Sequence, residues 1–377
     1  MSMLDGWDGW DGWDGWDGWD GWDGWDGASG GTVRSGRASA LALLRSRESI
    51  VGPYGDAQSP PKKALFRLAR GNGQLPSPHV DDALTQWSPA VRGRILLAEL
   101  LGSVRFEPKP AGGQVVLRHC DPQAKQPFAT LIRPDAALFQ QQCDLVENWA
   151  VHRAERAAEI LSQQKVNLAY WDAIVPLNPR TTPFTVELLL LAVAFASHVV
   201  QRFKHELACP RPRAYSPRIQ PMLAEPPYSA LPSGHATESF MLARLLQSLI
   251  EPKFSSDLKV RADQKAWLAE TSGQMTRLAN RIATNRVVAG IHFPIDNLAG
   301  QVLGVTLAEI VEHAGAGTGW RERRFDGRLA PAGDEFVPQD LGHGHAGYVY
   351  VATDPDKSTP EIPLVRWLWD RARKEWL

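Results

Sequence analysis

A series of long helical stretches in the second half of the chain restricts the fold more than any other feature. Apolar residues recur at helical spacing in five stretches, which are Asp135–Lys165, Phe184–Ala208, His235–Ile250, Leu258–Val288 and Pro294–His313. Successive amphipathic helices become stable by burying their apolar faces against each other. The sequence therefore predicts a mainly α fold, a helical bundle with minor β-hairpin decoration.

Shorter elements flank this bundle. The runs Gln114–Cys120 and Phe128–Arg133 alternate like two short strands, and Gly347–Ala352 is a third strand-like run. Further helices are expected at Ala38–Arg47, Lys62–Arg70, Ser88–Leu101 and Pro363–Lys374. We divide the chain into a low-complexity segment with a linker (1–36), an N-terminal helical region with a hairpin (37–133), a main helical domain (134–315) and a C-terminal extension (316–377).

The N-terminus is a repeat that fits no regular fold. Asp5–Trp25 is seven copies of Asp-Gly-Trp, and a period of three matches neither an amphipathic helix nor a strand. We interpret residues 1–36 as a disordered low-complexity segment, in preference to an acidic binding tail. The repeat also hides a charge imbalance. The whole chain has a formal charge of −1, but residues 28–377 carry 41 basic and 34 acidic residues. That mild excess suits a small anionic ligand and argues against a nucleic-acid partner.

The N-terminus, the apolar runs and the cysteines of the chain lead to expectations about its location. We see no basic region followed by an apolar stretch at the N-terminus, and no run of ~20 apolar residues that would span a membrane. Three Cys are too few and too scattered for a disulfide framework. The sequence predicts a soluble, cytoplasmic protein without an integral membrane segment, which could form a homo-oligomer.

Two motifs place polar residues at helix ends. In KHELACPRPR, Lys204 lies near the end of a helix, and Pro210 stops that helix before Arg211, so both cations could face one cavity. Lys and Arg also favour a helix C-terminus, so this motif alone is weak. In Pro-Ser-Gly-His, Ser233 is a natural N-cap and Gly234 allows close approach of the backbone. The amides of Gly234 and His235 would form an anion site, although an ordinary capped helix explains this motif as well.

The third motif is NRVVAGIHFPID. Arg286 lies near the end of a long helix, Gly290 can end it, and Pro294 begins the next. His292 would lie in the connecting turn, and Asp296 in the first turn of the new helix. Its carboxylate could accept a hydrogen bond from one nitrogen of His292 and leave the other nitrogen free. A His in a turn and an Asp at a helix N-terminus are an equally good structural explanation for this motif alone.

Together the three motifs supply the groups that bind a tetrahedral oxyanion. Lys204, Arg211 and Arg286 are three cations, Ser233 and Gly234 begin a helix, and two His have distinct surroundings. One His would act as nucleophile or ligand, and the other as acid or base on the opposite side.

This set resembles the superfamily of type 2 phosphatidic acid phosphatases (PAP2) and vanadium-dependent haloperoxidases, whose pattern is KxxxxxxRP, PSGH and SRxxxxxHxxxD. The resemblance covers about residues 199–303. It implies that Lys204, Arg211, Ser233, Gly234 and Arg286 bind the oxygens of phosphate or vanadate. It also implies that His235 is the acid–base residue, that His292 is the phosphohistidine nucleophile or axial vanadium ligand, and that Asp296 orients it. Asn285 stands where the pattern has Ser.

The resemblance leaves two reactions and a non-enzymatic alternative open. A haloperoxidase would hold vanadate and use hydrogen peroxide to oxidise halide. A soluble acid-phosphatase-like enzyme would need no cofactor and would hydrolyse a phosphate ester through His292. The Ala after Pro-Ser-Gly-His and the long N-terminal region favour the soluble haloperoxidase branch, while the short gaps between motifs argue against it. A non-catalytic anion-binding protein is the second alternative, and retention of His235 argues against that.

Overall fold

The computed structural model describes residues 83–251, 258–333, 335 and 347–376. The Asp-Gly-Trp repeat, the linker and the helices expected at Ala38–Arg47 and Lys62–Arg70 lie outside the described residues. Of the described residues, those from 93 onwards belong to one compact unit, and residues 83–92 belong to another. The described part of the second unit comprises η4 (Ala83–Gln86) and the first turn of α3 (Pro89–Gly102), where Arg92 donates to the carbonyl of Trp87 at 2.6 Å.

Helices dominate the larger unit, as predicted. After α3 they are α4 (Ala136–Trp149), α5 (Arg153–Ser162), α6 (Ala169–Asp172), α7 (Pro183–Leu207), α8 (Pro212–Tyr215), α9 (Gly234–Ile250), α10 (Leu258–Val288), α11 (Pro294–Ala316) and α12 (Pro363–Lys374). The stretch expected as one helix from Asp135 to Lys165 is interrupted by η6 (Ala150–His152) and ends at Ser162. No Pro or Gly marks this interruption in the sequence, so periodicity alone could not locate it.

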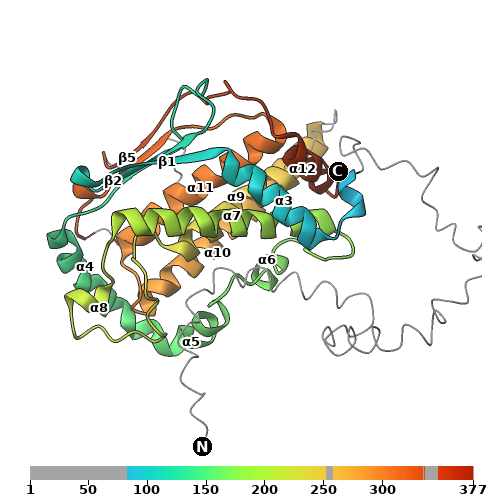
Figure 1. Ribbon diagram of the computed structural model, residues 1–377. Helices are drawn as coiled ribbons and strands as arrows, with labels where there is room; N and C mark the ends of the chain where they lie inside the picture. The colour runs from blue at the N-terminus through green and yellow to red at the C-terminus, as the bar shows by residue number, and fades with distance from the viewer. Residues whose placement is uncertain (1–82, 252–257, 334, 336–346, 377) are drawn as a thin grey trace, which may run out of the picture. The chain divides into compact units, whose positions relative to one another are not determined.

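Helix α11 forms the centre of the bundle. Its residues from Pro294 to Gly315 are buried almost without exception, as expected for a helix enclosed on all sides. It packs against α9, α7, α10 and α12 (Figure 1). Close contact with α9 depends on two glycines. A Cβ on Gly300 would lie 2.7 Å from the carbonyl oxygen of Ser233, and one on Gly304 would lie 2.3 Å from that of Thr237.

A sheet of five strands lies along the bundle and extends the predicted hairpin (Figure 1). Its order is β1 (Val104–Lys109), β2 (Gln114–His119), β3 (Ala129–Ile132), β4 (Arg323–Asp326) and β5 (Val349–Val351). Neighbouring strands are antiparallel except β3 and β4, which pair in parallel with Thr130 opposite Arg324. β1 and β4 were not predicted, because charged residues interrupt the short alternation of apolar and polar residues in both strands. The sheet combines strands from both sides of the helical region 134–315, and the domain boundaries expected from the sequence stay a prediction.

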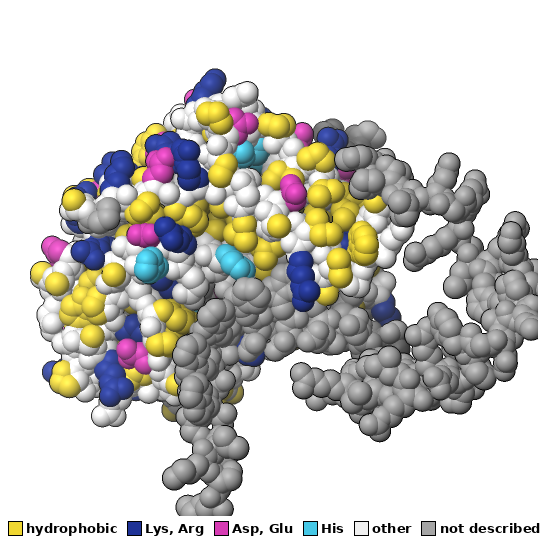
Figure 2. Space-filling model, viewed as in Figure 1, with side chains coloured by type: hydrophobic (Ala, Val, Ile, Leu, Met, Phe, Trp, Pro, Cys, Tyr) yellow, Lys and Arg dark blue, Asp and Glu magenta, His cyan; other side chains and the backbone are white. Residues whose placement is uncertain are grey.

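The apolar helix α7 is relevant to the prediction that the chain has no integral membrane segment. Among the described residues, the segment Pro183–Tyr215 is the one that is long and apolar enough to cross a membrane by length and composition. Of its apolar window, 67% is buried inside the protein, which is also typical of a core helix in a soluble protein. On the face shown in Figure 2, basic, acidic and hydrophobic side chains are interspersed. The absence of an integral membrane segment stays a prediction.

Candidate functional site

The end of α7 and the start of α8 place the first two cations. Lys204 lies on the last turn of α7, and Arg211 immediately precedes α8. Lys204 Nζ donates to the carbonyl oxygens of Ser229 and Ala230, both at 2.7 Å. Arg211 Nη1 donates to the carbonyl of Ile291 at 2.8 Å, and its Nε donates to that of Tyr228 at 3.0 Å. Both side chains are buried, so these carbonyls hold them in fixed positions.

The N-terminus of α9 places the second motif. Ser233 is the N-cap, and its Oγ accepts from the N–H of Ala236 at 3.4 Å. Gly234 is the first residue of the helix and His235 the second. The ring Nε2 of His235 lies 2.8 Å from the carbonyl oxygen of Gln163, in the turn after α5. The predicted N-cap is therefore confirmed, and the helix directs its first amides towards the site.

The turn between α10 and α11 places the third motif. Gly290 has a φ of +76°, which favours glycine, and it follows the end of α10. His292 Nδ1 lies 3.0 Å from Oδ2 of Asp296, and the same oxygen accepts from the N–H of Phe293 at 2.9 Å. Because Oδ2 is an acceptor, we assign the proton to Nδ1 of His292. The other ring nitrogen, Nε2, then carries the lone pair.

Backbone contacts lock the three motifs together. Lys204 binds the carbonyl of Ala230, which precedes α9, and Arg211 binds the carbonyl of Ile291, which precedes His292. The N–H of Ser233 donates to the carbonyl of Asp296 at 2.9 Å. The structure therefore brings the eight predicted residues into one region: Lys204, Arg211, Ser233, Gly234, His235, Arg286, His292 and Asp296. Their chemical roles stay predictions.

Burial governs protonation in this region. It lowers the pKa of His292 well below its ordinary value, and Arg211, Lys204, His235 and Arg286 lower it further. Burial and Arg286 together lower the pKa of His235 to about 3. Burial raises the pKa of Asp296 to about 7, although the Phe293 amide and the nearby cations oppose the rise. Both imidazoles are neutral at pH 7, as a nucleophile or ligand and a general base require.

Arg286 is the cation with unused hydrogen-bond donors. It is fully buried, and its Nη2 donates to the carbonyl of Ile160 at 3.2 Å. Its Nε and Nη1 have no hydrogen-bond partner among the described residues, and neither has Oδ1 of Asp296. A buried guanidinium with free N–H groups is costly unless an anion binds it. Phosphate and vanadate both supply the oxygen acceptors that these donors lack.

Two hollows adjoin the site. One is small, with a volume of about 20 Å³, and is lined by His235, Glu238, Trp171 and Leu242, among others. The other is wider and is lined by Lys204, Arg211 and Tyr228, among others. Burial raises the pKa of Glu238 to about 8, so this side chain holds a proton beside His235 at neutral pH. Glu238 therefore lies in the wall of the smaller pocket as a neutral carboxyl group.

Sequence reasoning missed the residues that surround Arg286 and His235. Asn285, which stands where the motif has Ser, donates from Nδ2 to Glu159 Oε2 at 3.0 Å and to Gln163 Oε1 at 2.9 Å. Its side chain therefore faces α5. Asn285 was visible in the sequence as a departure from the motif, but no local signal pointed to Glu159 or Gln163, which lie more than 120 residues away.

The site lies within a segment that matches a known family. Residues 186–316 match the family model described as the PAP2 superfamily. This segment, which carries the site, belongs to the PAP2 superfamily. It is also similar to the vanadium-dependent bromoperoxidase of Ascophyllum nodosum, with 25% identity over 209 residues. That alignment covers 52% of this chain and 35% of the relative, so the chain spans about a third of the length of the curated relative that it matches.

The PAP2 match contains most of α7 and all of α8, α9, α10 and α11 among the described elements. It includes the end of α7, the start of α9 and the turn before α11, and hence all eight predicted residues. Gln163 and Glu159 lie outside it. The mainly α fold and the superfamily expected from the sequence are confirmed.

Proposed function

We propose that this PAP2 protein is a vanadium-dependent haloperoxidase-like enzyme, which uses hydrogen peroxide to oxidise a halide. The observation that carries the proposal is the buried Arg286 guanidinium, whose Nε and Nη1 have no partner among the described residues, in the same site as the hydrogen-bonded pair of His292 and Asp296. The similarity to a vanadium-dependent bromoperoxidase supports this reaction over others of the superfamily.

The residues present fit vanadate. His292 would hold the metal through Nε2, because Asp296 fixes the proton on Nδ1. Arg286, Lys204 and Arg211 would balance the negative charge, and the first amides of α9 after Ser233 would donate to the oxygens. When bound, vanadate supplies the Lewis-acid chemistry that activates hydrogen peroxide for halide oxidation.

His235 would move the proton in this reaction. Its pKa of about 3 reflects burial and the positive charge of Arg286. An anion bound to Arg286 would offset that charge and raise the pKa of His235 towards the range where it can both accept and donate a proton. His235 would then accept a proton when peroxide binds and return it as the halide is oxidised.

The test uses substrates, because both reactions of the superfamily need the same pocket. Purified protein freed of anions is supplied with vanadate, hydrogen peroxide, bromide and a halogen acceptor. We expect vanadate-dependent halogenation. His292→Ala should lose vanadate binding, and His235→Ala should retain vanadate but lose at least roughly 100-fold in turnover, because an acid–base group acts mainly on the transition state.

A parallel assay supplies a phosphate monoester without vanadate. Ester hydrolysis that vanadate inhibits, without halogenation, would replace our proposal by a phosphatase acting through a phosphohistidine at His292. The same His292–Asp296 pair favours this second candidate, since a neutral Nε2 oriented by a carboxylate is also a nucleophile. Anion binding without either activity would indicate a non-catalytic binding protein.

A further inference from the structure

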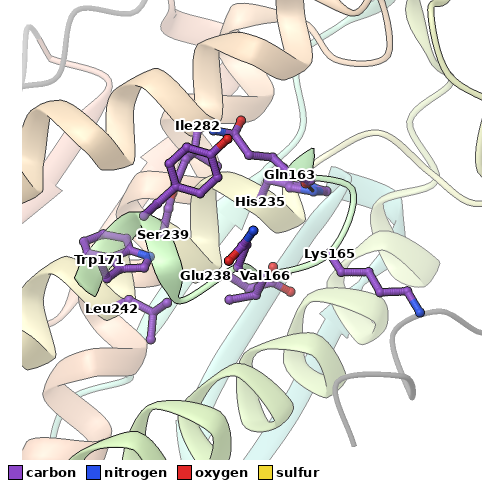
Figure 3. Close-up of a pocket in the computed structure, with 11 residues that line it drawn as sticks. Gln163, Lys165, Val166, Trp171, His235, Glu238, Ser239, Leu242 and Ile282 are labelled. Carbon is purple, nitrogen blue, oxygen red and sulfur yellow. Dashed lines mark hydrogen bonds between the residues drawn. The ribbon is translucent and has the colours of Figure 1, made fainter. Parts of the chain in front are cut away.

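Gln163 lies outside the three motifs, but it contacts a residue of the second motif and a residue of the third. It is a buried residue at the end of α5. Its backbone carbonyl lies 2.8 Å from Nε2 of His235, and its side-chain Oε1 accepts from Arg286 Nη2 at 3.4 Å. Figure 3 shows Gln163 next to His235 in the wall of the pocket. One residue thus joins the acid–base imidazole to the guanidinium with free donors.

The backbone contact determines the tautomer of His235. A carbonyl oxygen can only accept a hydrogen bond, so Nε2 of His235 must carry the proton. The neutral ring then has its lone pair on Nδ1. Proton transfer at this imidazole therefore takes place at Nδ1, while Nε2 stays bound to Gln163.

The hydrogen bond between the side chains of Asn285 and Gln163 also has one possible direction, with Asn285 as the donor. The Glu159 carboxylate accepts hydrogen bonds from Arg281 Nε at 2.9 Å and from Asn285 Nδ2 at 3.0 Å. Burial opposes ionisation, but the contacts with Arg281 and Asn285 lower the pKa of Glu159 to about 2, so it is an acceptor only. Asn285 must therefore present its NH₂ group to Glu159, and the same group donates to Oε1 of Gln163 at 2.9 Å.

Serine could not make this connection. Its hydroxyl has one hydrogen to donate, whereas Asn285 donates to Glu159 and to Gln163 from one NH₂ group. The amide orientation of Gln163 follows from this chain, since two donors, Asn285 and Arg286, both point at Oε1. Its Nε2 then has no partner among the described residues and is buried.

We propose that Gln163 is a positioning residue of this site, which holds His235 in the Nε2–H tautomer and orients Arg286, and that Asn285 fixes its amide in the required direction. The inference rests on the proposed function only in assuming that the site binds a tetrahedral oxyanion. It does not depend on whether the reaction is halide oxidation or ester hydrolysis.

The first test measures the Kd of inorganic phosphate by calorimetry. Gln163→Met keeps the length of the side chain but removes the acceptor, and we expect the Kd to rise about tenfold, as for the loss of a hydrogen bond to a charged group. Asn285→Ser should raise the Kd by a smaller factor. The double variant should bind no more weakly than Gln163→Met alone, because Asn285 acts through Gln163. Gln164→Met is the matched control, since the side chain of Gln164 is exposed and its one hydrogen bond within the described part of the chain goes to the Leu161 carbonyl.

The second test measures the tautomer of His235 directly. In protein labelled with ¹⁵N-histidine, the ring nitrogens report which of them carries the proton. We expect His235 at pH 7 to be neutral with the proton on Nε2. Gln163→Met keeps the backbone carbonyl, so this tautomer should stay the same, but the pH at which the signal titrates should change because Arg286, whose charge lowers the pKa of His235, loses its side-chain acceptor. The signal can be assigned by its loss in His235→Ala.

Three results would overturn the proposal: an Nδ1–H tautomer of His235, a phosphate Kd that Gln163→Met leaves unchanged, or equal losses in Gln163→Met and Gln164→Met. Additive effects of Gln163→Met and Asn285→Ser would reject the role of Asn285. Failure of the proposed reaction would look different, because the unmodified protein would bind phosphate and show the expected tautomer but would not halogenate.

Discussion

At the scale of single residues, burial sets the protonation of the site more than ion pairing does. Burial is the largest cause of the lowered pKa values of Lys204 and Arg286 and of the raised value of Glu238. Lys204 and Arg286 lack a carboxylate partner within hydrogen-bond distance in the described part of the chain and bind carbonyl oxygens instead. If this site holds an oxyanion, as we propose, the anion should bind strongly, because the folded protein has already met the cost of removing these cations from water.

Glu238 makes the cost of burying an ionised side chain measurable, because its raised pKa causes the stability of the protein to depend on pH. In the unfolded chain its carboxyl loses its proton near pH 4.5, whereas the folded protein holds the proton up to about pH 8. Between these values the folded state binds more protons, so the contribution of Glu238 to stability is lost as the pH rises. Glu238→Gln has no proton to lose. We expect its melting temperature, compared with that of the unmodified protein, to rise steadily from pH 5 to pH 8.5. A difference that is the same at every pH would show that Glu238 does not hold its proton.

At the scale of elements, the site lies where the end of one helix packs against the side of another. The N-terminus of α9 lies against the flank of α11, and the carbonyl of Ser233 would be 2.7 Å from a Cβ on Gly300. Because Gly300 has no side chain, the first turn of α9 can lie close to the turn that carries His292. The glycine is therefore required by a close approach between two helices rather than by its own backbone angles.

Gly300→Ala tests this approach. The new methyl group would meet Ala236 Cβ and the Ser233 carbonyl, both at 2.7 Å, and it must push α9 away. We expect a loss of about 1–3 kcal/mol in the free energy of unfolding, typical of overpacking, and a weaker affinity for phosphate because the helix N-terminus moves. Gly273→Ala on α10 is the matched control. Its methyl group would contact the flexible end of Arg277 at 3.2 Å, and we expect a gain of about 0.5–1 kcal/mol from helix propensity. Urea denaturation measures both, and equal stabilities would contradict the close packing of α9 on α11.

At the scale of the whole molecule, local signals were readable from the sequence and long-range ones were not. Ser233 as N-cap, Gly290 after a helix and Asp296 in a first turn all depend on neighbours within a few residues, and the structure has them as predicted. The pairing of β3 with β4 joins residues almost 200 positions apart, and the periodicity of the sequence cannot predict such a pairing. The same is true of Gln163, whose contacts with Asn285 and Arg286 exist only because α5 packs on α10.

The end of the chain offers a test of such a long-range connection. The Glu375 carboxylate accepts hydrogen bonds from the N–H groups of Phe184 and Thr185, both at 2.8 Å, and so caps the first turn of α7. α7 has no side-chain cap of its own at Thr182. A carboxylate there satisfies free N–H groups and favours the helix dipole. Glu375→Ala should therefore lower the free energy of unfolding by about 1–2 kcal/mol.

Asp370→Ala on the same helix, α12, is the control for this variant. Asp370 is exposed, and its contact with Arg366 spans 3.8 Å, so we expect a change of no more than about 0.5 kcal/mol. The Kd for phosphate should be the same in both variants, because Lys204 lies at the opposite end of the 25-residue helix α7. Urea denaturation followed by circular dichroism measures the two stabilities. If Glu375→Ala is as stable as Asp370→Ala, the last residues of the chain do not hold the N-terminus of α7. If it also weakens phosphate binding, the whole helix shifts as one body when its cap is lost.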